Sequence, residues 1–150
     1  MSNRDIMKAI KANKQRRHSM TYQENYQKWV DFADLPDYLR QDLINMDEKT
    51  KEDAFYTNLE FGTAGMRGLI GAGTNRINIY VVRQATEGLA RLIESKGGNE
   101  KERGVAIAYD SRHFSPEFAF ESAAVLAKHG IKSYVFESLR PTPELSFAVR

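Results

Sequence analysis

The chain has 150 residues, a formal net charge of +2 and an ordinary globular composition, with 41% hydrophobic and 28% charged residues. It contains no cysteine, which excludes disulfides and thiolate chemistry and fits a reducing, cytoplasmic location. No apolar run approaches the roughly 20 residues that span a bilayer, so we expect no membrane partner.

The positive charge is concentrated at the N-terminus. Residues 1–19 hold six Lys or Arg and one acidic residue, so this segment carries +5 and residues 20–150 carry −3. Such a segment can bind nucleic acid or a membrane, or it can be an upstream extension without function. Because a strong helix start follows at once, we interpret residues 1–19 as a basic leader or extension. We expect no nucleic-acid partner, since the remaining residues show no basic face.

Three helices are predicted near the N-terminus. Thr21 and Glu24 have the spacing of a capping box, in which each side chain accepts a hydrogen bond from the other residue's backbone N–H. The aromatic residues of the helix that follows recur at helical spacing, which indicates packing. Pro36 interrupts this helix, and a second is expected over residues 37–45, with inward side chains at Tyr38, Leu39 and Leu43. Residues 48–56 are highly charged and predict a third, exposed helix.

Residues 61–68, FGTAGMRG, are the most distinctive stretch of the chain. Its three glycines let backbone N–H groups approach a ligand closely, and oriented amides in such loops form concave anion sites. Arg67 adds a planar fork of donors suited to phosphate or carboxylate. The stretch therefore indicates a small-molecule anion site, foremost for phosphate. The alternative is a glycine-rich turn with a surface arginine, since no phosphate loop of standard spacing is present.

A long helix is predicted after this stretch. Residues 69–73 come first, as an apolar, strand-like run. Asn78 is a suitable N-cap for a helix whose inward stripe contains Ile79, Val82, Thr86, Leu89 and Ile93. Gly97 and Gly98 are expected to end it.

The second half of the chain has the pattern of an α/β fold. Residues 104–109 and 131–136 have the length and composition of buried parallel strands. Between them, Ser115 is the expected N-cap of a helix that stops at Gly130. A strand–helix–strand unit of this kind has parallel strands and a right-handed crossover.

Ligands of such units bind at the carboxyl ends of the strands, here in residues 110–115 and 137–143. In the first loop, Asp110, Arg112 and His113 suit a phosphate site, and equally Asp110 and Arg112 suit an ion pair that fixes the turn. His113 is a candidate general acid or base, although a lone loop histidine is commonly exposed and idle. The second loop is interpreted as an ordinary connection. The histidines have no metal-ligand spacing and no nucleophile signature is visible, so we assign no catalytic or metal residue.

A last helix opens at Thr142, and the sequence stops at Arg150 without a helix stop signal. We therefore expect a fragment of a longer protein, cut within a domain that begins at residue 20. The truncated edge is expected to expose apolar surface and to promote association.

Four motifs occur in order: FGTAGMRG at 61–68, GAGTNRINIY at 71–80, AYDSRHFSPEFA at 108–119 and LRPTPELSFAVR at 139–150. Together they resemble the amino-terminal domain of the α-D-phosphohexomutases, closest to the bacterial phosphoglucomutase group. The resemblance covers about residues 20–150. It implies the first of four domains, an α/β fold with a mixed sheet, βαβ units and flanking helices, preceded by an N-terminal helical segment.

The same resemblance implies an activity and its residues. The implied reaction converts glucose 1-phosphate and glucose 6-phosphate through a phosphoserine enzyme. The implied cofactors of the whole enzyme are Mg²⁺ and glucose 1,6-bisphosphate, and we expect neither to be bound by this chain alone. Arg67 matches the family arginine that contacts the bisphosphate or the phosphoserine region, Thr63 and Gly65 shape its loop, and Arg112 matches the strand-end motif. The phosphoserine and the magnesium ligands are expected beyond Arg150. We therefore expect this chain alone to be inactive, with the phosphosugar and the remaining domains as its partners.

Two alternatives remain. A phosphopentomutase or phosphomannomutase would use the same chemistry, and the family's sugar-selecting loop is not within this sequence. A non-catalytic nucleotide-binding module would use the same strand–helix–strand unit, but the pattern GxGxxG is absent after its strand. Measurable binding of NAD or ATP would favour the module.

Overall fold

The computed structural model describes residues 20–62 and 65–149. They divide into two compact units. The first unit contains the residues up to Asn58 together with Gly73–Asn75, and the second contains Leu59–Ala72 and the residues from Arg76 onward. The prediction for residues 1–19 lies outside the described residues.

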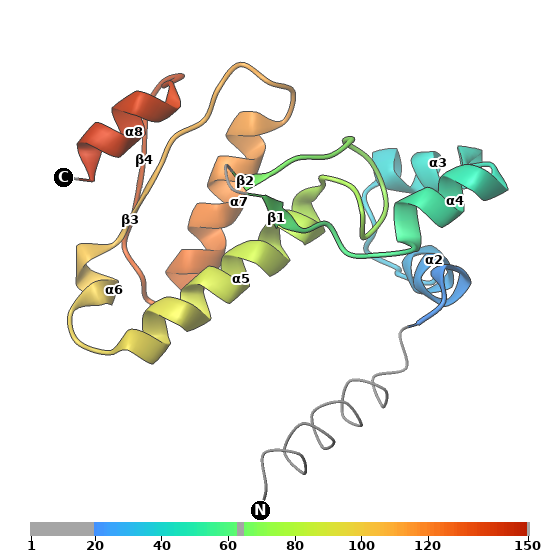
Figure 1. Ribbon diagram of the computed structural model, residues 1–150, viewed down its shortest axis with the longest axis horizontal. Helices are drawn as coiled ribbons and strands as arrows, with labels where there is room; N and C mark the ends of the chain where they lie inside the picture. The colour runs from blue at the N-terminus through green and yellow to red at the C-terminus, as the bar shows by residue number, and fades with distance from the viewer. Residues whose placement is uncertain (1–19, 63–64, 150) are drawn as a thin grey trace, which may run out of the picture. The chain divides into compact units, whose positions relative to one another are not determined.

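The described residues are mostly helical (Figure 1). The first unit holds α2 (Tyr22–Val30), α3 (Asp37–Asn45) and α4 (Glu48–Phe55). The second unit holds β1 (Phe61–Gly62), β2 (Gly65–Met66), α5 (Ile79–Lys96), α6 (Glu100–Arg103), β3 (Val105–Ile107), α7 (Ser115–Lys128), β4 (Ser133–Val135) and α8 (Thr142–Ala148).

The helix starts of the first unit follow from local side-chain caps. Glu24 N donates to Thr21 Oγ1 at 3.2 Å and Thr21 N donates to Glu24 Oε2 at 2.7 Å, which confirms the predicted capping box. α3 has the predicted bounds and begins directly after Pro36. Asp47 caps α4 by accepting a hydrogen bond from Thr50 N at 2.8 Å.

Phe55 is the centre of the first unit's core. Its side chain is fully buried, and the rings of Tyr26 and Trp29 meet it edge-on at centroid distances of 5.5 and 5.8 Å. The prediction of an exposed α4 is therefore wrong at its C-terminal end, where Phe55 closes the core. Tyr38, also predicted to point inward, is 44% exposed, because the fully buried stripe of α3 runs along Leu39 and Leu43 at i, i+4 spacing.

Gly73–Asn75, the GTN tip, join the first unit by binding the last carbonyl groups of α4. Asn75 donates from its backbone N to Ala54 O at 2.9 Å and from Nδ2 to Asp53 O at 3.0 Å. A Cβ at Gly73, where φ is +133°, would lie 2.6 Å from Ala54 O. These carbonyls have no partner within the helix, so the GTN tip satisfies them, and only glycine allows its close approach.

In the second unit, α5 and α7 pack side by side (Figure 1). Asn78 caps α5 and Gly97, with φ of +67°, ends it, as predicted. The core between the helices and the strands contains Ala90, Leu126 and Ile131, with Ile93, Val105 and Ile107 packed against them. Leu89 lies at the margin of the α5 stripe and is 40% exposed, so its predicted inward position is wrong.

β3 and β4 pair in parallel, with Val105 opposite Ser133 and Ile107 opposite Val135. Because α7 connects them, the predicted strand–helix–strand unit is confirmed. Both strands are shorter than predicted and only partly buried, since the helices cover one face. β1 and β2 form a separate antiparallel pair, so the expected single mixed sheet is not formed among residues 20–62 and 65–149.

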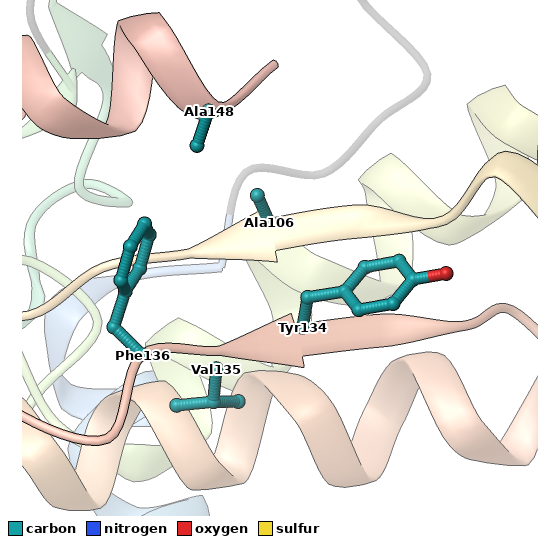
Figure 2. A pocket seen from close by; sticks show the side chains of 5 residues that line it. All are labelled: Ala106, Tyr134, Val135, Phe136 and Ala148. Atoms are coloured by element: carbon teal, nitrogen blue, oxygen red, sulfur yellow. The ribbon is translucent and has the colours of Figure 1, made fainter.

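The other face of the β3–β4 pair lines a shallow apolar pocket of about 340 Å³. Ala106 and Tyr134 are register partners on this face, Phe136 follows β4, and Ala148 of α8 lies opposite (Figure 2). Tyr134 remains 57% exposed. Helices therefore cover one face of the two strands, and the other face is only lightly covered.

Candidate functional site

Arg67 directly follows β2 at the end of the glycine-rich stretch. Gly65 lies in β2 opposite Gly62, whereas Thr63 lies outside the described residues. Arg67 is exposed and makes no ion pair with the carboxylates in the described part of the chain. An exposed guanidinium without a carboxylate partner keeps its full charge and its donors for an anion.

The segment after Arg67 is held by backbone hydrogen bonds to the start of α5. Ile77 N donates to Leu69 O at 2.8 Å, and Gly71 N donates to Ile77 O at 3.1 Å. Apart from the single bridge between Ile70 and Ile77, the predicted strand at residues 69–73 is not formed.

Asn78 has a second role that its sequence position did not reveal. Its Oδ1 accepts from Val81 N at 3.0 Å, which is the predicted cap, while its Nδ2 donates to Gly71 O at 2.8 Å. The side chain is 1% exposed. In the sequence, the residue type was the available hint of this second bond. Asparagine caps a helix no better than serine or aspartate, but its side chain also has an N–H donor that the cap does not use.

Arg112 lies in the loop after β3 and is paired with Asp110. Arg112 Nη2 lies 2.7 Å from Asp110 Oδ2, and Arg112 N donates to Asp110 Oδ1 at 3.1 Å. Hydrogen bonds from Arg112 lower the pKa of Asp110 to about 2. The predicted ion pair is confirmed, and its zero net charge makes Arg112 a weaker attractor of anions than Arg67.

The α7 start differs from the prediction. Phe114, not Ser115, is the N-cap residue, and its φ of +62° is unusual for a bulky side chain. Its ring contacts those of His113 and Phe118, at centroid distances of 4.2 and 6.0 Å. Ser115 Oγ instead accepts from Asp110 N at 3.2 Å and closes the loop. The described contacts of the exposed His113 give no evidence for or against the predicted role as a general acid or base.

The loop after β4 lies beside the loop after β3. Arg140 N donates to Tyr109 O at 3.0 Å, which joins the two strand ends. The Arg140 guanidinium donates to Ser138 Oγ at 2.7 Å and pairs with Glu144 at 3.0 Å. These contacts support the structural role predicted for residues 137–143.

The two candidate anion segments lie at the same end of the α5–α7 pair. Arg83 near the start of α5 holds Glu121 of α7 with a bidentate pair at 2.7 and 3.0 Å. His129, at the end of α7, contacts Glu94 near the end of α5 at 3.2 Å. The helices therefore run parallel, and their N-termini share one end. Both N-terminal dipoles add positive potential there, where residues 67–71 and 110–115 precede the helices.

Within the described residues, no group of three or more His, Asp or Glu side chains is placed to hold a metal ion. The same residues include no helix with the length and apolarity needed to cross a membrane.

Comparisons with known proteins bear on these segments. The family model for phosphoglucomutase/phosphomannomutase, alpha/beta/alpha domain I, matches residues 58–150. A phosphoglucomutase of Staphylococcus epidermidis is 41% identical over 123 residues, covering 81% of this chain and 22% of the relative. Phosphoglucomutases of Staphylococcus aureus and Staphylococcus haemolyticus are 44% and 42% identical over 100 residues, covering 67% of the chain and 18% of each relative. The chain thus spans about a fifth of the length of these curated relatives. No solved structure matches it.

Proposed function

The chain belongs to the phosphoglucomutase/phosphomannomutase family, and from that premise we propose that it forms a phosphate-binding part of a phosphoglucomutase. The proposed enzyme interconverts glucose 1-phosphate and glucose 6-phosphate. A phosphoserine of the whole enzyme gives its phosphoryl group to the free hydroxyl oxygen of the substrate. The resulting glucose 1,6-bisphosphate reorients, and its other phosphoryl group returns to the serine oxygen.

The observation that carries the proposal is the state of Arg67. It is exposed, has no carboxylate partner among the described residues, and follows a glycine-rich hairpin within the segment that matches the family. A guanidinium binds phosphate through two parallel N–H donors, and a positioned cation stabilises charge on a phosphoryl group during transfer. We assign Arg67 to hold a substrate phosphate, with Thr63 and Gly65 shaping its loop.

Arg112 has a lesser role in this proposal. Its guanidinium already binds Asp110, so a phosphate at this loop meets a neutralised pair. We assign Arg112 to the wall of the site and expect it to contribute less than Arg67 to phosphate binding.

Family membership also implies Mg²⁺, which neutralises phosphoryl charge when bound. The described residues hold no cluster of carboxylates or histidines that fits this ion. We therefore assign no metal-dependent step to the described residues of this chain. Its share of the chemistry is binding and orienting phosphate.

The test is a titration of a phosphoglucomutase that carries this sequence with glucose 1,6-bisphosphate at low ionic strength, followed by calorimetry. Arg67→Ala is expected to weaken binding at least tenfold, because a charge-assisted bidentate contact is lost. In a phosphoglucomutase that carries this sequence, the same change is expected to lower kcat/KM about 100-fold. Arg112→Ala is expected to have a smaller effect on both.

The matched control is Arg91→Ala, which removes an arginine that is 74% exposed on α5 and paired with Glu87. It is expected to leave binding and activity unchanged. Equal losses of binding in the Arg67 and Arg91 variants would mean that the effect comes from the change in net charge, and they would contradict the assignment. Parallel assays of the whole enzyme with glucose 1-phosphate and mannose 1-phosphate address the choice of sugar, because the family description includes both mutases and the sugar-selecting loop lies outside this sequence.

A further inference from the structure

We propose that Asn78 is the positioning residue of the Arg67 segment, which it fixes against the start of α5. The functional consequence rests on the proposed phosphate-binding role of Arg67. The mechanical consequence, a fixed segment, is independent of that role and can be tested separately.

Asn78 makes two bonds of different kinds with one buried side chain. Capping α5 requires only an acceptor, which Oδ1 supplies to Val81 N at 3.0 Å. The donor Nδ2 is not needed for the cap, and it reaches Gly71 O at 2.8 Å. Because the Asn78 side chain is 1% exposed, water does not readily replace this contact, and losing it leaves the partly buried Gly71 carbonyl with one partner fewer.

Hydrogen bonds, rather than burial, hold residues 69–71 in place. Leu69 is 68% exposed and Ile70 is 44% exposed, so their side chains contribute little packing. The backbone bonds Ile77 N to Leu69 O and Gly71 N to Ile77 O join the segment to residues next to Asn78. Asn78 adds the third bond and connects all of them to α5.

This anchorage reaches Arg67 because the intervening chain is short. Arg67 precedes Leu69 by two residues, and each trans peptide sets consecutive Cα atoms about 3.8 Å apart. At Gly68, a Cβ would lie 3.0 Å from Leu59 Cδ1, so the chain passes closely over that side chain. The position of Arg67 is thus limited on its C-terminal side by an anchored segment, which reduces the ordering required when phosphate binds.

Asn78→Ser separates the two bonds. Serine still caps α5 but cannot reach Gly71, whereas Asn78→Ala loses both contacts. The measurement is amide hydrogen exchange under native conditions. In both variants the Gly71 and Ile77 amides are expected to exchange about tenfold faster. The Val81 amide is expected to keep its protection in Asn78→Ser and to lose it in Asn78→Ala.

Asp47→Ala is the matched control, because it removes an N-cap of the same kind from α4. It is expected to leave the Gly71 and Ile77 amides unchanged. Unchanged exchange of these amides in Asn78→Ser would overturn the proposal, whatever the ligand data show.

The functional arm places each variant in a phosphoglucomutase that carries this sequence and titrates it with glucose 1,6-bisphosphate well below its unfolding temperature. Asn78→Ser and Asn78→Ala are expected to weaken binding about fivefold, and Asp47→Ala to leave it unchanged. Faster exchange with unchanged affinity would overturn the positioning of Arg67. If the unsubstituted enzyme binds no bisphosphate, the proposed function fails. In that case ¹⁵N relaxation of Arg67 decides the inference, with lower order in Asn78→Ser supporting it and equal order overturning it.

Discussion

At the scale of single residues, two arginines of the candidate site differ in what surrounds them. Arg112 pairs with Asp110, whose pKa of about 2 keeps it ionised across the neutral range, so this charge is compensated. Arg67 has no such partner among the described residues. Residue type alone does not distinguish the two, and their different neighbours make Arg67 the better candidate for an anion.

Two glycines make a matched pair for a stability prediction. A Cβ at Gly73 would lie 2.6 Å from Ala54 O at a φ of +133°, whereas a Cβ at Gly88, on the exposed side of α5, meets no atom within 4 Å. Gly73→Ala is expected to lower the free energy of unfolding by about 1–3 kcal/mol, through backbone strain and loss of the GTN contacts. Gly88→Ala is expected to raise it by about 1 kcal/mol, since alanine is the better helix former.

Urea unfolding of the two variants checks these signs. The neighbouring Thr74 belongs to the same GTN tip, and its Oγ1 donates a hydrogen bond to Thr57 O just after α4. Displacing the tip would therefore strain this contact as well. If Gly73→Ala leaves the free energy of unfolding unchanged, the GTN tip can be displaced from α4 with little loss of stability. It would then follow that the tip does not stabilise the first unit.

At the scale of elements, His129 joins the end of α7 to α5. Its Nε2 lies 2.9 Å from Glu87 and its Nδ1 lies 3.2 Å from Glu94. Lys101 of α6 binds Glu94 at 3.0 Å and donates to His129 O at 2.8 Å, and Arg91 pairs with Glu87. Hydrogen bonds with Glu87 and then Glu94 raise the pKa of His129, and hydrogen bonding to His129 lowers the pKa of Glu87.

These shifts predict a pH window for stability. A raised pKa for His129 means that its contribution is fully present below its ordinary value of 6.5 and is lost as pH rises through the folded value. The lowered pKa of Glu87 means that its contribution is present above 4.5 and is lost as the solution becomes more acid. Unfolding of the chain and of His129→Gln, compared across pH, should differ most between these values and converge at alkaline pH.

His113→Gln is the control for this series, because His113 is exposed and contacts only the Phe114 ring among the described interactions. This substitution is expected to change the free energy of unfolding little, because it removes no ion pair between described residues. A constant difference for His129→Gln from pH 5 to pH 9 would mean that packing, not charge, accounts for the role of His129.

The sequence was informative about elements wherever the determinants are local. The capping box at Thr21, the start of α3 after Pro36 and the glycine end of α5 depend on neighbours within a few residues, and each was predicted. The prediction that Pro36 interrupts the first helix is wrong, because α2 already ends at Val30. The left-handed Phe114 and the second bond of Asn78 depend on contacts made after folding. Periodicity alone did not reveal them, and for the same reason it misplaced the margins of the α3 and α5 stripes.

At the scale of the whole molecule, the family match begins at residue 58, after the helices of the first unit. The GTN tip lies within the matched range, yet its partners Asp53 and Ala54 lie before it. The match to the Staphylococcus epidermidis protein covers 81% of the chain and so includes residues before 58. The first unit therefore includes three residues of the matched range, Gly73–Asn75.

The lightly covered face of the β3–β4 pair predicts self-association of this chain. Tyr134 is 57% exposed there, and Phe147 and Val149 near the C-terminal end are 82% and 66% exposed. Apolar side chains beside strand edges that are unpaired among the described residues favour pairing with another chain. Sedimentation is expected to show species larger than the 17.1 kDa monomer at about 100 μM, and Tyr134→Lys with Phe147→Lys is expected to shift them toward monomer. Leu92→Lys, at a 54% exposed position on α5, is the control and should not shift these species toward monomer. A monomer at all concentrations, or equal effects of both lysine changes, would contradict association through this face.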